Sequence, residues 1–185
     1  ELDRRTVSEL VAFLLAAGVE TVREVMLFNL LTLADSPSFV PLAGDESQLP
    51  SLADELLRLE PPVHTLQRRV SSETGIGGHT IPAGDLVWAS IAAANRDPSH
   101  FDLPDNIVLD RKGPRHISFG SGPHFCLGSQ LGKLESEVIL AEMVRFVPGL
   151  IERRGTRKMV FAGPGGGGSR RGVIRGCRLI DERWE

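Results

Sequence analysis

Residues 119–128 read Phe-Gly-Ser-Gly-Pro-His-Phe-Cys-Leu-Gly and contain one cysteine, Cys126, among three glycines and a proline. Apolar residues follow at steps of three or four, which predicts a helix over residues 127–146 that ends at Pro148-Gly149. Cys126 is therefore expected where a glycine-rich loop enters a helix. Free backbone N–H groups and the helix dipole favour a thiolate over a thiol at that point.

Glycine at positions 120, 122 and 128 would let the backbone turn sharply and approach a flat ligand that any Cβ would push away. Two weaker interpretations stand beside this one. A lone cysteine is more often a small buried apolar residue, and paired glycines alone are weak evidence of a site. The complete ten-residue pattern is far more specific than either of its parts.

The pattern Phe-x-x-Gly-x-x-x-Cys-x-Gly resembles the haem-binding loop of the cytochrome P450 family. The resemblance implies that the Cys126 thiolate ligates haem iron. It also implies that His124 reaches a haem propionate, an anion that needs fixed donors. The positions that match the family's cofactor-binding loop over 119–128 are Phe119, Gly120, Gly122, His124, Cys126 and Gly128.

Residues 4–34 are apolar nearly all round, which predicts one long helix in the middle of the protein. The chain begins inside this helix with neither an initiator methionine nor a cap, which leads us to expect a fragment. Residues 17–21, Ala-Gly-Val-Glu-Thr, resemble the family's central oxygen-binding motif. The resemblance gives Glu20 and Thr21 catalytic roles with dioxygen. Gly18 costs roughly 1 kcal/mol relative to alanine, which suggests a close approach to another group, and the resemblance implies that this group is the haem.

Residues 51–59 predict a helix that contains Glu55 and Arg58 on one face. An exposed pair at this spacing is common and contributes only a few tenths of a kcal/mol. The sequence also resembles the family's Glu-x-x-Arg motif, a buried structural pair close to the haem-binding loop. Where many relatives have Pro-x-Arg-Phe, residues 104–107 read Pro-Asp-Asn-Ile. Because Asn106 carries no charge, we expect the triad with Glu55 and Arg58 to be incomplete.

Residues 67–95 predict a β region with a strand over 86–94. Arg68 lies at the head of this region. The resemblance implies that Arg68 reaches a haem propionate.

Composition restricts the class of protein. The 185 residues are 41% hydrophobic with a net charge of −3, which fits a globular protein, and no apolar run approaches the ~20 residues of a membrane span. Cys126 and Cys177 form no Cys-x-x-Cys pair, which argues against a disulfide framework and a zinc site and favours the cytoplasm. Cys177 is not expected to bind iron.

Charge is divided unevenly. Residues 1–110 hold seven Lys and Arg against seventeen Asp and Glu, whereas residues 111–185 hold fourteen against seven. Nucleic-acid binding is disfavoured, because only 5% of the residues are aromatic and none is tyrosine. We expect instead that cations of the basic half steer an acidic ferredoxin-type electron donor, and the candidates are Arg111, Lys112, Arg115 and Lys133.

The resemblance runs from about residue 8 to 150 and more weakly to 180. It implies a single partial domain over 1–185, mainly α with a minor β part, equivalent to the C-terminal half of a soluble bacterial cytochrome P450. Residues 150–185 match poorly. Within them, 163–168 predict a flexible glycine turn and 173–180 a terminal strand.

The implied activity is monooxygenation of an unidentified small organic substrate. It uses haem b, dioxygen, and electrons from NAD(P)H through a reductase and a ferredoxin. The chain alone is expected to be inactive, because the missing half would hold most of the substrate pocket. Two alternatives stay open. A non-catalytic haem-thiolate sensor or carrier would need neither Glu20 nor Thr21, and a truncated inactive product would bind no haem.

Overall fold

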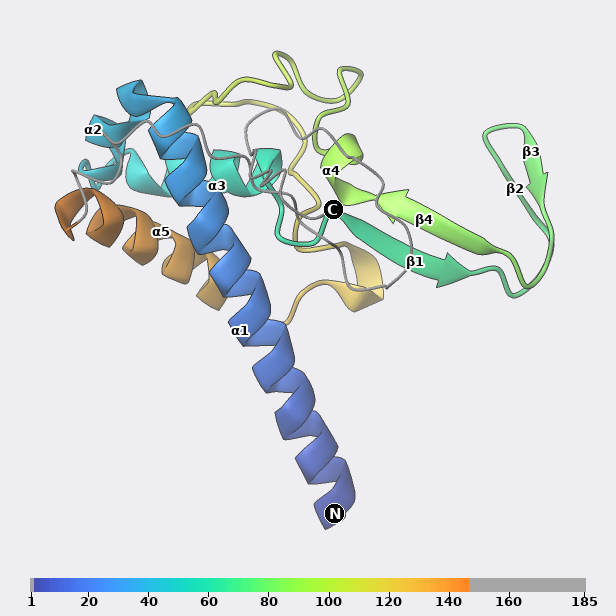
Figure 1. Ribbon diagram of the computed structural model, residues 1–185. Coiled ribbons are helices and arrows are strands. Elements are labelled where there is room, and N and C mark those ends of the chain that lie inside the picture. Colours follow the sequence, from blue (N-terminus) through green and yellow to red (C-terminus); the bar gives the residue numbers. More distant parts are fainter. Residues whose placement is uncertain (1, 147–185) are drawn as a thin grey trace, which may run out of the picture.

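The computed structural model describes residues 2–146, and Figure 1 shows their arrangement. The regular elements in chain order are α1 (Arg4–Asp35), the 3-10 turn η1 (Pro37–Phe39), α2 (Val40–Ala43), α3 (Leu49–Leu59), β1 (Thr65–Arg69), β2 (Thr74–Ile76), β3 (His79–Ile81), β4 (Leu86–Ser90), α4 (Ile91–Ala94), the 3-10 turn η2 (Gly122–His124) and α5 (Ser129–Phe146). The described chain is thus mainly helical with a small β part, as the sequence predicts. The expected glycine turn, the terminal strand and Cys177 lie outside the described residues.

The first helix, α1, has an N-terminal cap, so the expectation of an uncapped start is wrong. Asp3 has an extended backbone, and its Oδ1 accepts a hydrogen bond of 2.7 Å from the Thr6 N–H. A carboxylate at this position satisfies one of the free N–H groups of the first turn. At the other end, the Ser36 N–H donates to the Thr32 carbonyl at 2.9 Å and closes the last turn.

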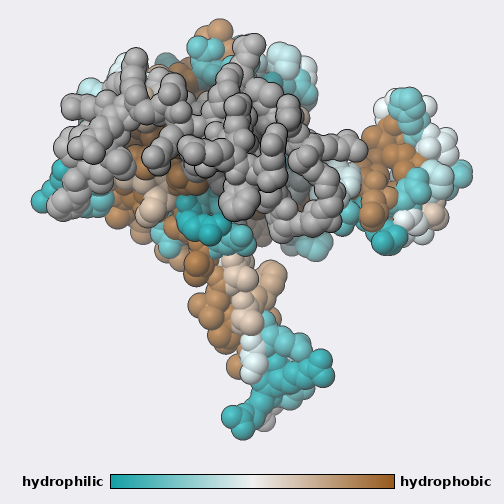
Figure 2. Space-filling view, in the orientation of Figure 1, coloured by the Kyte–Doolittle hydropathy of each residue, from teal (hydrophilic) through white to brown (hydrophobic). Residues whose placement is uncertain are grey.

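Only the C-terminal half of α1 is buried, which corrects the expectation of a helix covered all round. Val25, Phe28 and Leu33 are buried, whereas residues 4–20 lie at the surface apart from the half-buried Thr6. Figure 1 shows the N-terminal half projecting beyond the other elements, and Figure 2 shows apolar side chains along it. Among the described residues, no element covers that half. The apolar pattern predicted the helix correctly, but it could not show which segments pack on it.

The core lies where α1, α2, α3 and α5 meet. Its buried apolar members are Leu33, Ala43, Leu52, Ala53, Leu56 and Leu140. They come from four helices that are far apart in sequence, so burying them brings distant segments together. Among the helices of residues 2–146, none is both long and apolar enough to cross a membrane.

Helix α5 packs on the core through an unexpected face. Three of the apolar residues that predicted the helix, Leu131, Leu134 and Val138, are exposed. The buried face instead carries Ser136 and Leu140, and Ser136 Oγ accepts a 3.3 Å hydrogen bond from the Asn29 amide of α1. A small residue allows the two helices to approach, and its buried hydroxyl is paired with the Asn29 amide.

The β part consists of two antiparallel pairs, β1 with β4 and β2 with β3. The last strand ends at Ser90, earlier than the expected residue 94, because Ser90 Oγ accepts a 3.2 Å hydrogen bond from the Ala93 N–H. This cap starts the short helix α4 instead of extending the strand. The change of direction buries Ile91 and Asn95 against the rest of the chain.

Helix α3 buries an ionic group centred on Glu55. Arg58 binds the Glu55 carboxylate through two hydrogen bonds, Nε to Oε1 at 2.8 Å and Nη2 to Oε2 at 3.1 Å. Arg111 binds the same two oxygens at 2.8 and 3.1 Å. The expectation of an incomplete triad is therefore wrong. The second guanidinium comes from Arg111, five residues after the position where it was sought.

Asn106 takes part through its backbone. Its carbonyl accepts hydrogen bonds from Arg58 at 2.8 Å and Arg111 at 3.2 Å, while its side chain is exposed. Both cations lie near the ring of Phe101, with centroid distances of 5.4 Å to Arg58 and 5.9 Å to Arg111. Both guanidiniums thus face an aromatic ring that favours cations.

Burial raises the pKa of the Glu55 carboxyl, but hydrogen bonds from Arg58, Arg111 and the Val108 N–H outweigh it. The net pKa lies below its ordinary value. The contribution of Glu55 to stability is therefore fully present above the unfolded-state value of about 4.3 and is lost as pH falls through the folded-state pKa.

We expect Glu55→Ala to lower the free energy of unfolding by about 3–5 kcal/mol, because it strands two buried cations. Urea unfolding followed by circular dichroism measures this change at neutral pH. The difference in free energy of unfolding between this variant and the wild type should become smaller in acid. Glu46→Ala, at an exposed glutamate, is the control. A neutral-pH cost below about 1 kcal/mol would contradict the buried ionic group.

Arg111 and Asn106 give a matched comparison. Arg111→Met removes charged hydrogen bonds to Glu55 and should cost about 1.5–3 kcal/mol. Asn106→Ala keeps the backbone carbonyl that the guanidiniums use and should change stability by less than about 0.5 kcal/mol. The same unfolding measurement separates them. Equal losses in both variants would show that Asn106 acts through its side chain.

Candidate functional site

The loop that carries Cys126, residues 119–128, is called here the cysteine loop. Its two ends are tied by a 2.9 Å hydrogen bond from the Cys126 N–H to the Phe119 carbonyl. Gly120 and Gly122 have φ angles of 74° and 63°. A Cβ at Gly120 would also lie 3.4 Å from the His124 carbonyl oxygen. These two positions require glycine for backbone reasons alone.

The loop presents its sulfur to the outside. Cys126 is a free and exposed cysteine. The Ser129 N–H donates to the Cys126 carbonyl at 3.3 Å, and α5 begins at Ser129, two residues later than expected. Cys126 thus lies three residues before the first residue of the helix, as the sequence predicts for a loop that enters a helix.

Asn95 anchors the approach to this loop, and sequence reasoning did not single it out. Its side-chain amide donates to the Arg58 carbonyl at 3.1 Å and to Ser118 Oγ at 2.8 Å. Its Oδ1 accepts from the Ile117 N–H at 2.9 Å. Asn95 is fully buried and its side-chain amide and carbonyl are both paired, so its role is structural. It ties the end of α3 to the two residues before the cysteine loop.

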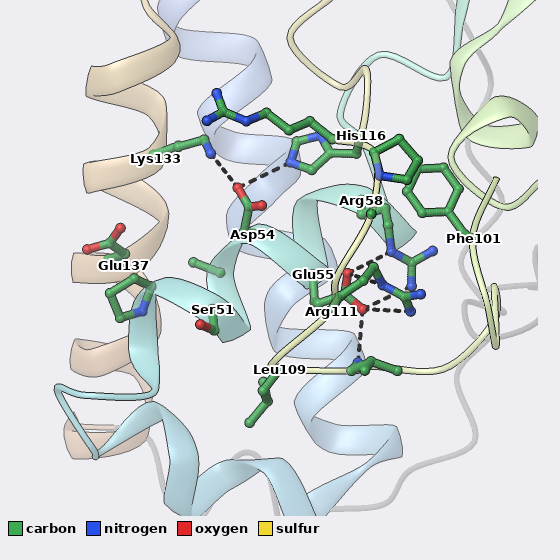
Figure 3. Close-up of a pocket in the computed structure, with 16 residues that line it drawn as sticks. Ser51, Asp54, Glu55, Arg58, Phe101, Leu109, Arg111, His116, Lys133 and Glu137 are labelled. Atoms are coloured by element: carbon green, nitrogen blue, oxygen red, sulfur yellow. Dashed lines mark hydrogen bonds and ion pairs between the residues drawn. The ribbon is translucent and has the colours of Figure 1, made fainter.

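A second group of charges borders the loop. Asp54 of α3 accepts a hydrogen bond of 3.2 Å from His116 Nε2 and forms an ion pair with Lys133 of α5 (Figure 3). Burial raises the pKa of the Asp54 carboxyl, but the hydrogen bonds from His116 and Lys133 and the positive charge of Lys133 outweigh it. The pKa of Asp54 therefore lies well below its ordinary range, and the group carries a negative charge at neutral pH.

A cavity of about 350 Å³ lies beside these two charge groups, and Figure 3 shows the residues around it. Asp54, His116 and Lys133 lie on one side of it and Glu55, Arg58 and Arg111 on another. The cavity belongs to the joint between α3, α5 and the segment that leads to the cysteine loop. It does not contain Cys126.

The residues expected to handle dioxygen lie on the projecting part of α1. Thr21 is half-buried, and its hydroxyl donates to the Ala17 carbonyl of its own helix at 2.7 Å. Glu20 is exposed and lies 3.8 Å from Arg23. A Cβ at Gly18 would meet no described atom within 4 Å, so no protein group accounts for the glycine. The sequence predicts this helix in the middle of the protein, but in the part of the chain that the structure describes Glu20 is exposed and Thr21 only half-buried.

The two residues expected at haem propionates are both exposed. Arg68 lies on β1 and donates to the Gln67 carbonyl at 2.9 Å. His124 ends the turn η2 inside the cysteine loop. Within residues 2–146, no hydrogen bond or ion pair joins these two side chains to one another or to Thr21. The structure groups the loop residues together and leaves Arg68 and the α1 residues on separate elements.

His64 is a further residue that sequence reasoning missed. Its ring stacks on Phe28 of α1 with centroids 5.6 Å apart. Its Nε2 is buried without a hydrogen-bond partner among the described residues. Burial lowers the pKa of His64, against the opposing effect of the Glu24 charge. The isolated position of this histidine in the sequence provided no signal.

Comparison with known proteins places these observations in a family. The family model described as Cytochrome P450 matches residues 49–147, which is more than half of the chain. The curated 20-oxo-5-O-mycaminosyltylactone 23-monooxygenase of Streptomyces fradiae is 37% identical over 150 residues, covering 80% of this chain and 36% of that protein. The chain therefore spans about a third of the length of this relative.

Solved structures agree. CYP109E1 from Bacillus megaterium, in complex with testosterone, superposes with a TM-score of 0.73 and 33% identity, over 80% of this chain and 41% of that chain. The cytochrome P450 PksS of Bacillus subtilis 168 gives a TM-score of 0.75 at 31% identity, over 80% of this chain and 39% of that one. Since the family model spans the buried ionic group, the cysteine loop and α5, this chain belongs to the cytochrome P450 family.

Proposed function

We propose that this chain carries the haem-ligating and oxygen-handling residues of a monooxygenase that acts on a small organic substrate. The observation that carries the proposal is the cysteine loop. Its free sulfur is exposed on a backbone that two glycines with positive φ hold in place, just before the start of a helix. A structural cysteine would be buried, whereas Cys126 is exposed.

The groups around Cys126 fit haem. The cysteine thiolate is a soft ligand suited to iron, so Cys126 would hold the haem iron. Large apolar side chains beside it are uncovered: Phe125 is 54% exposed, Leu127 91% and Leu131 59%. An apolar macrocycle gives such side chains a partner. Arg68 and His124, both exposed, would bind its propionates.

The net reaction places one oxygen atom in the substrate and reduces the other to water, with two electrons and two protons taken up. Haem with a thiolate ligand supplies the electron density that favours O–O cleavage. The chain must supply the protons and the electrons. Thr21 and Glu20 are the proposed proton groups, because their hydroxyl and carboxylate are adjacent on α1 and both can exchange protons with water.

Electrons are proposed to arrive from a ferredoxin-type donor, but fewer cations are free to steer it than the sequence suggests. Arg111 is committed to Glu55, and Lys133 is paired with Asp54. Lys112 and Arg115 are exposed and stay as the steering candidates near the cysteine loop. Other basic residues of the expected basic half lie beyond residue 146, outside the described residues.

Replacing the proposed ligand tests the assignment directly. In haem-loaded protein expressed from the complete coding sequence, the reduced carbon monoxide complex should show the red-shifted absorption band of thiolate ligation. Cys126→Ser should abolish that band, because a hydroxyl is a poor substitute for a thiolate. Cys177→Ser should leave it unchanged and serves as the control. A normal thiolate band in Cys126→Ser would remove the basis of the proposal.

Thr21→Ala should keep haem and substrate binding but uncouple electron use from product. With a proton group lost, the electrons would be released as hydrogen peroxide instead of forming product. Product per NAD(P)H should fall at least several-fold, and by no more than the roughly 10²–10⁴ that one acid–base group contributes. Ser8→Ala is a matched control, because Ser8 makes the same hydroxyl-to-carbonyl bond within α1. Unchanged coupling would favour the alternative of a haem protein without oxygenase chemistry.

Salt tests the electron donor. The rate of haem reduction by an acidic ferredoxin should fall as ionic strength rises, because salt screens charges beyond about 10 Å at 0.1 M. Lys112→Gln combined with Arg115→Gln should slow reduction at low salt and flatten the salt dependence. Arg5→Gln, at the far end of α1, should have no effect. Rates that ignore ionic strength would contradict electrostatic steering.

A further inference from the structure

Two neighbouring carboxylates of α3 serve different parts of the structure. Glu55 is buried and holds Arg58 and Arg111, whereas the adjacent Asp54 is half-exposed and holds His116 and Lys133. Figure 3 shows the Asp54 carboxylate between the histidine and the lysine. The stabilising role of the Glu55 group is clear from its burial. The role of Asp54 calls for a separate explanation.

The partners of Asp54 lie on opposite sides of Cys126 in the chain. His116 precedes the cysteine by ten residues, on the segment that leads into the cysteine loop. Lys133 follows it by seven residues, near the start of α5. One carboxylate on a third element therefore holds both arms of the loop. An arrangement of this kind limits how far the two arms can separate or rotate against α3.

The entering arm transmits this restraint through His116. The Ser118 N–H donates to His116 Nδ1 at 3.2 Å, so the neutral ring carries its proton on Nε2, which donates to Asp54. The ring also contacts Phe119, with centroids 6.1 Å apart. The Phe119 carbonyl in turn accepts the Cys126 N–H at 2.9 Å. The path from Asp54 to the cysteine backbone is continuous.

The path from Asp54 to the cysteine through the leaving arm, which begins after Cys126 and includes Lys133, is equally short. Lys133 is four residues beyond Ser129, whose N–H donates to the Cys126 carbonyl. Gly132, the residue before Lys133, faces the Phe119 ring so closely that a Cβ at Gly132 would lie 3.4 Å from the ring. Phe119 therefore packs against both arms. A shift of α5 along α3 would move this ring and the cysteine together.

The ion pair itself adds little to global stability. The Asp54 side chain is 45% exposed and that of Lys133 40%. Pairs this exposed contribute little to the free energy of unfolding because water screens them. The hydrogen bond to His116 is better protected, since that side chain is only 6% exposed. The arrangement therefore suits local geometry more than overall stability.

We propose that Asp54 is a positioning residue for the Cys126 thiolate, holding the two arms of the cysteine loop in register through His116 and Lys133. The proposal rests on the proposed function, in which Cys126 ligates haem iron. It assigns no step of the reaction to Asp54, which acts only through the backbone on either side of the cysteine. Its loss should therefore loosen the loop without unfolding the protein.

The test uses haem-loaded protein from the complete coding sequence in four forms: wild type, Asp54→Ala, Lys133→Met and the control Glu137→Gln. Glu137 is a carboxylate of α5 that lines the same cavity but is not bound to His116 or Lys133. Two readouts are measured besides the thermal midpoint. One is amide hydrogen exchange over residues 116–133, and the other is the fraction of reduced carbon monoxide complex that keeps the thiolate band.

In Asp54→Ala we expect amide exchange in the cysteine loop to accelerate by roughly twofold to fivefold, the range open to a partly exposed ion pair. The thiolate fraction should fall relative to total haem, with little change in thermal midpoint. Glu137→Gln should match the wild type in both readouts. Lys133→Met should loosen the start of α5 and leave the exchange of residues 116–118 nearly unchanged.

Unchanged loop exchange and thiolate fraction in Asp54→Ala would overturn the proposal. So would a lower thermal midpoint with a normal band in the protein that stays folded, because that result describes a stabilising residue only. If Asp54→Ala does not fold, Asp54→Asn keeps the size and the acceptor oxygen and is judged by the same two readouts. A wild type without the thiolate band would refute the proposed function, while the exchange comparison would still decide whether Asp54 holds the two arms.

Discussion

The fold depends on two guanidiniums that share one buried carboxylate. Arg58 is 1% exposed and cannot stay in the interior unless its charge and its N–H groups are paired. Glu55 supplies the charge, and the carbonyls of Asn95, Pro104 and Asn106 take the N–H groups that Glu55 leaves over. The pairing forces an irregular segment of the chain to pass close to α3. Without it, residues 95–111 would have few reasons to adopt one path.

The cysteine loop is positioned by this same construction. Asn95 connects the carbonyl of Arg58 to Ile117 and Ser118, and the Ser118 hydroxyl donates to the Leu57 carbonyl at 2.7 Å. The segment that enters the loop is thus bonded to the backbone of α3, directly beside the buried ionic group. A loop that must aim one sulfur needs a rigid support, and the end of α3 provides it. This explains why structural and ligand-binding residues lie so close in this part of the chain.

Two apolar surfaces are uncovered in the described residues, on the projecting part of α1 and on the outer face of α5. They correspond to the residues whose periodicity predicted both helices most strongly. Figure 2 shows the first of them along the extended helix. A periodic pattern reports that a face requires an apolar partner, but it does not say whether the partner is protein or cofactor. The chain spans only 36% of the Streptomyces fradiae relative, so local pattern and observed burial need not agree.

Sequence alone determined the elements whose signal is local. The helices near residues 4–34 and 51–59, the glycines of the cysteine loop and the position of Cys126 before a helix all follow from residue spacing and backbone freedom. Tertiary structure decided which side chains meet. It paired Arg111 with Glu55, although the uncharged Asn106 had suggested an incomplete triad. It also used Asn95 to connect α3 to the segment before the cysteine loop, and it brought His116 and Lys133 to Asp54. Hydrogen bonds between groups 50 or more residues apart leave no periodic trace in the chain, and only folding reveals them.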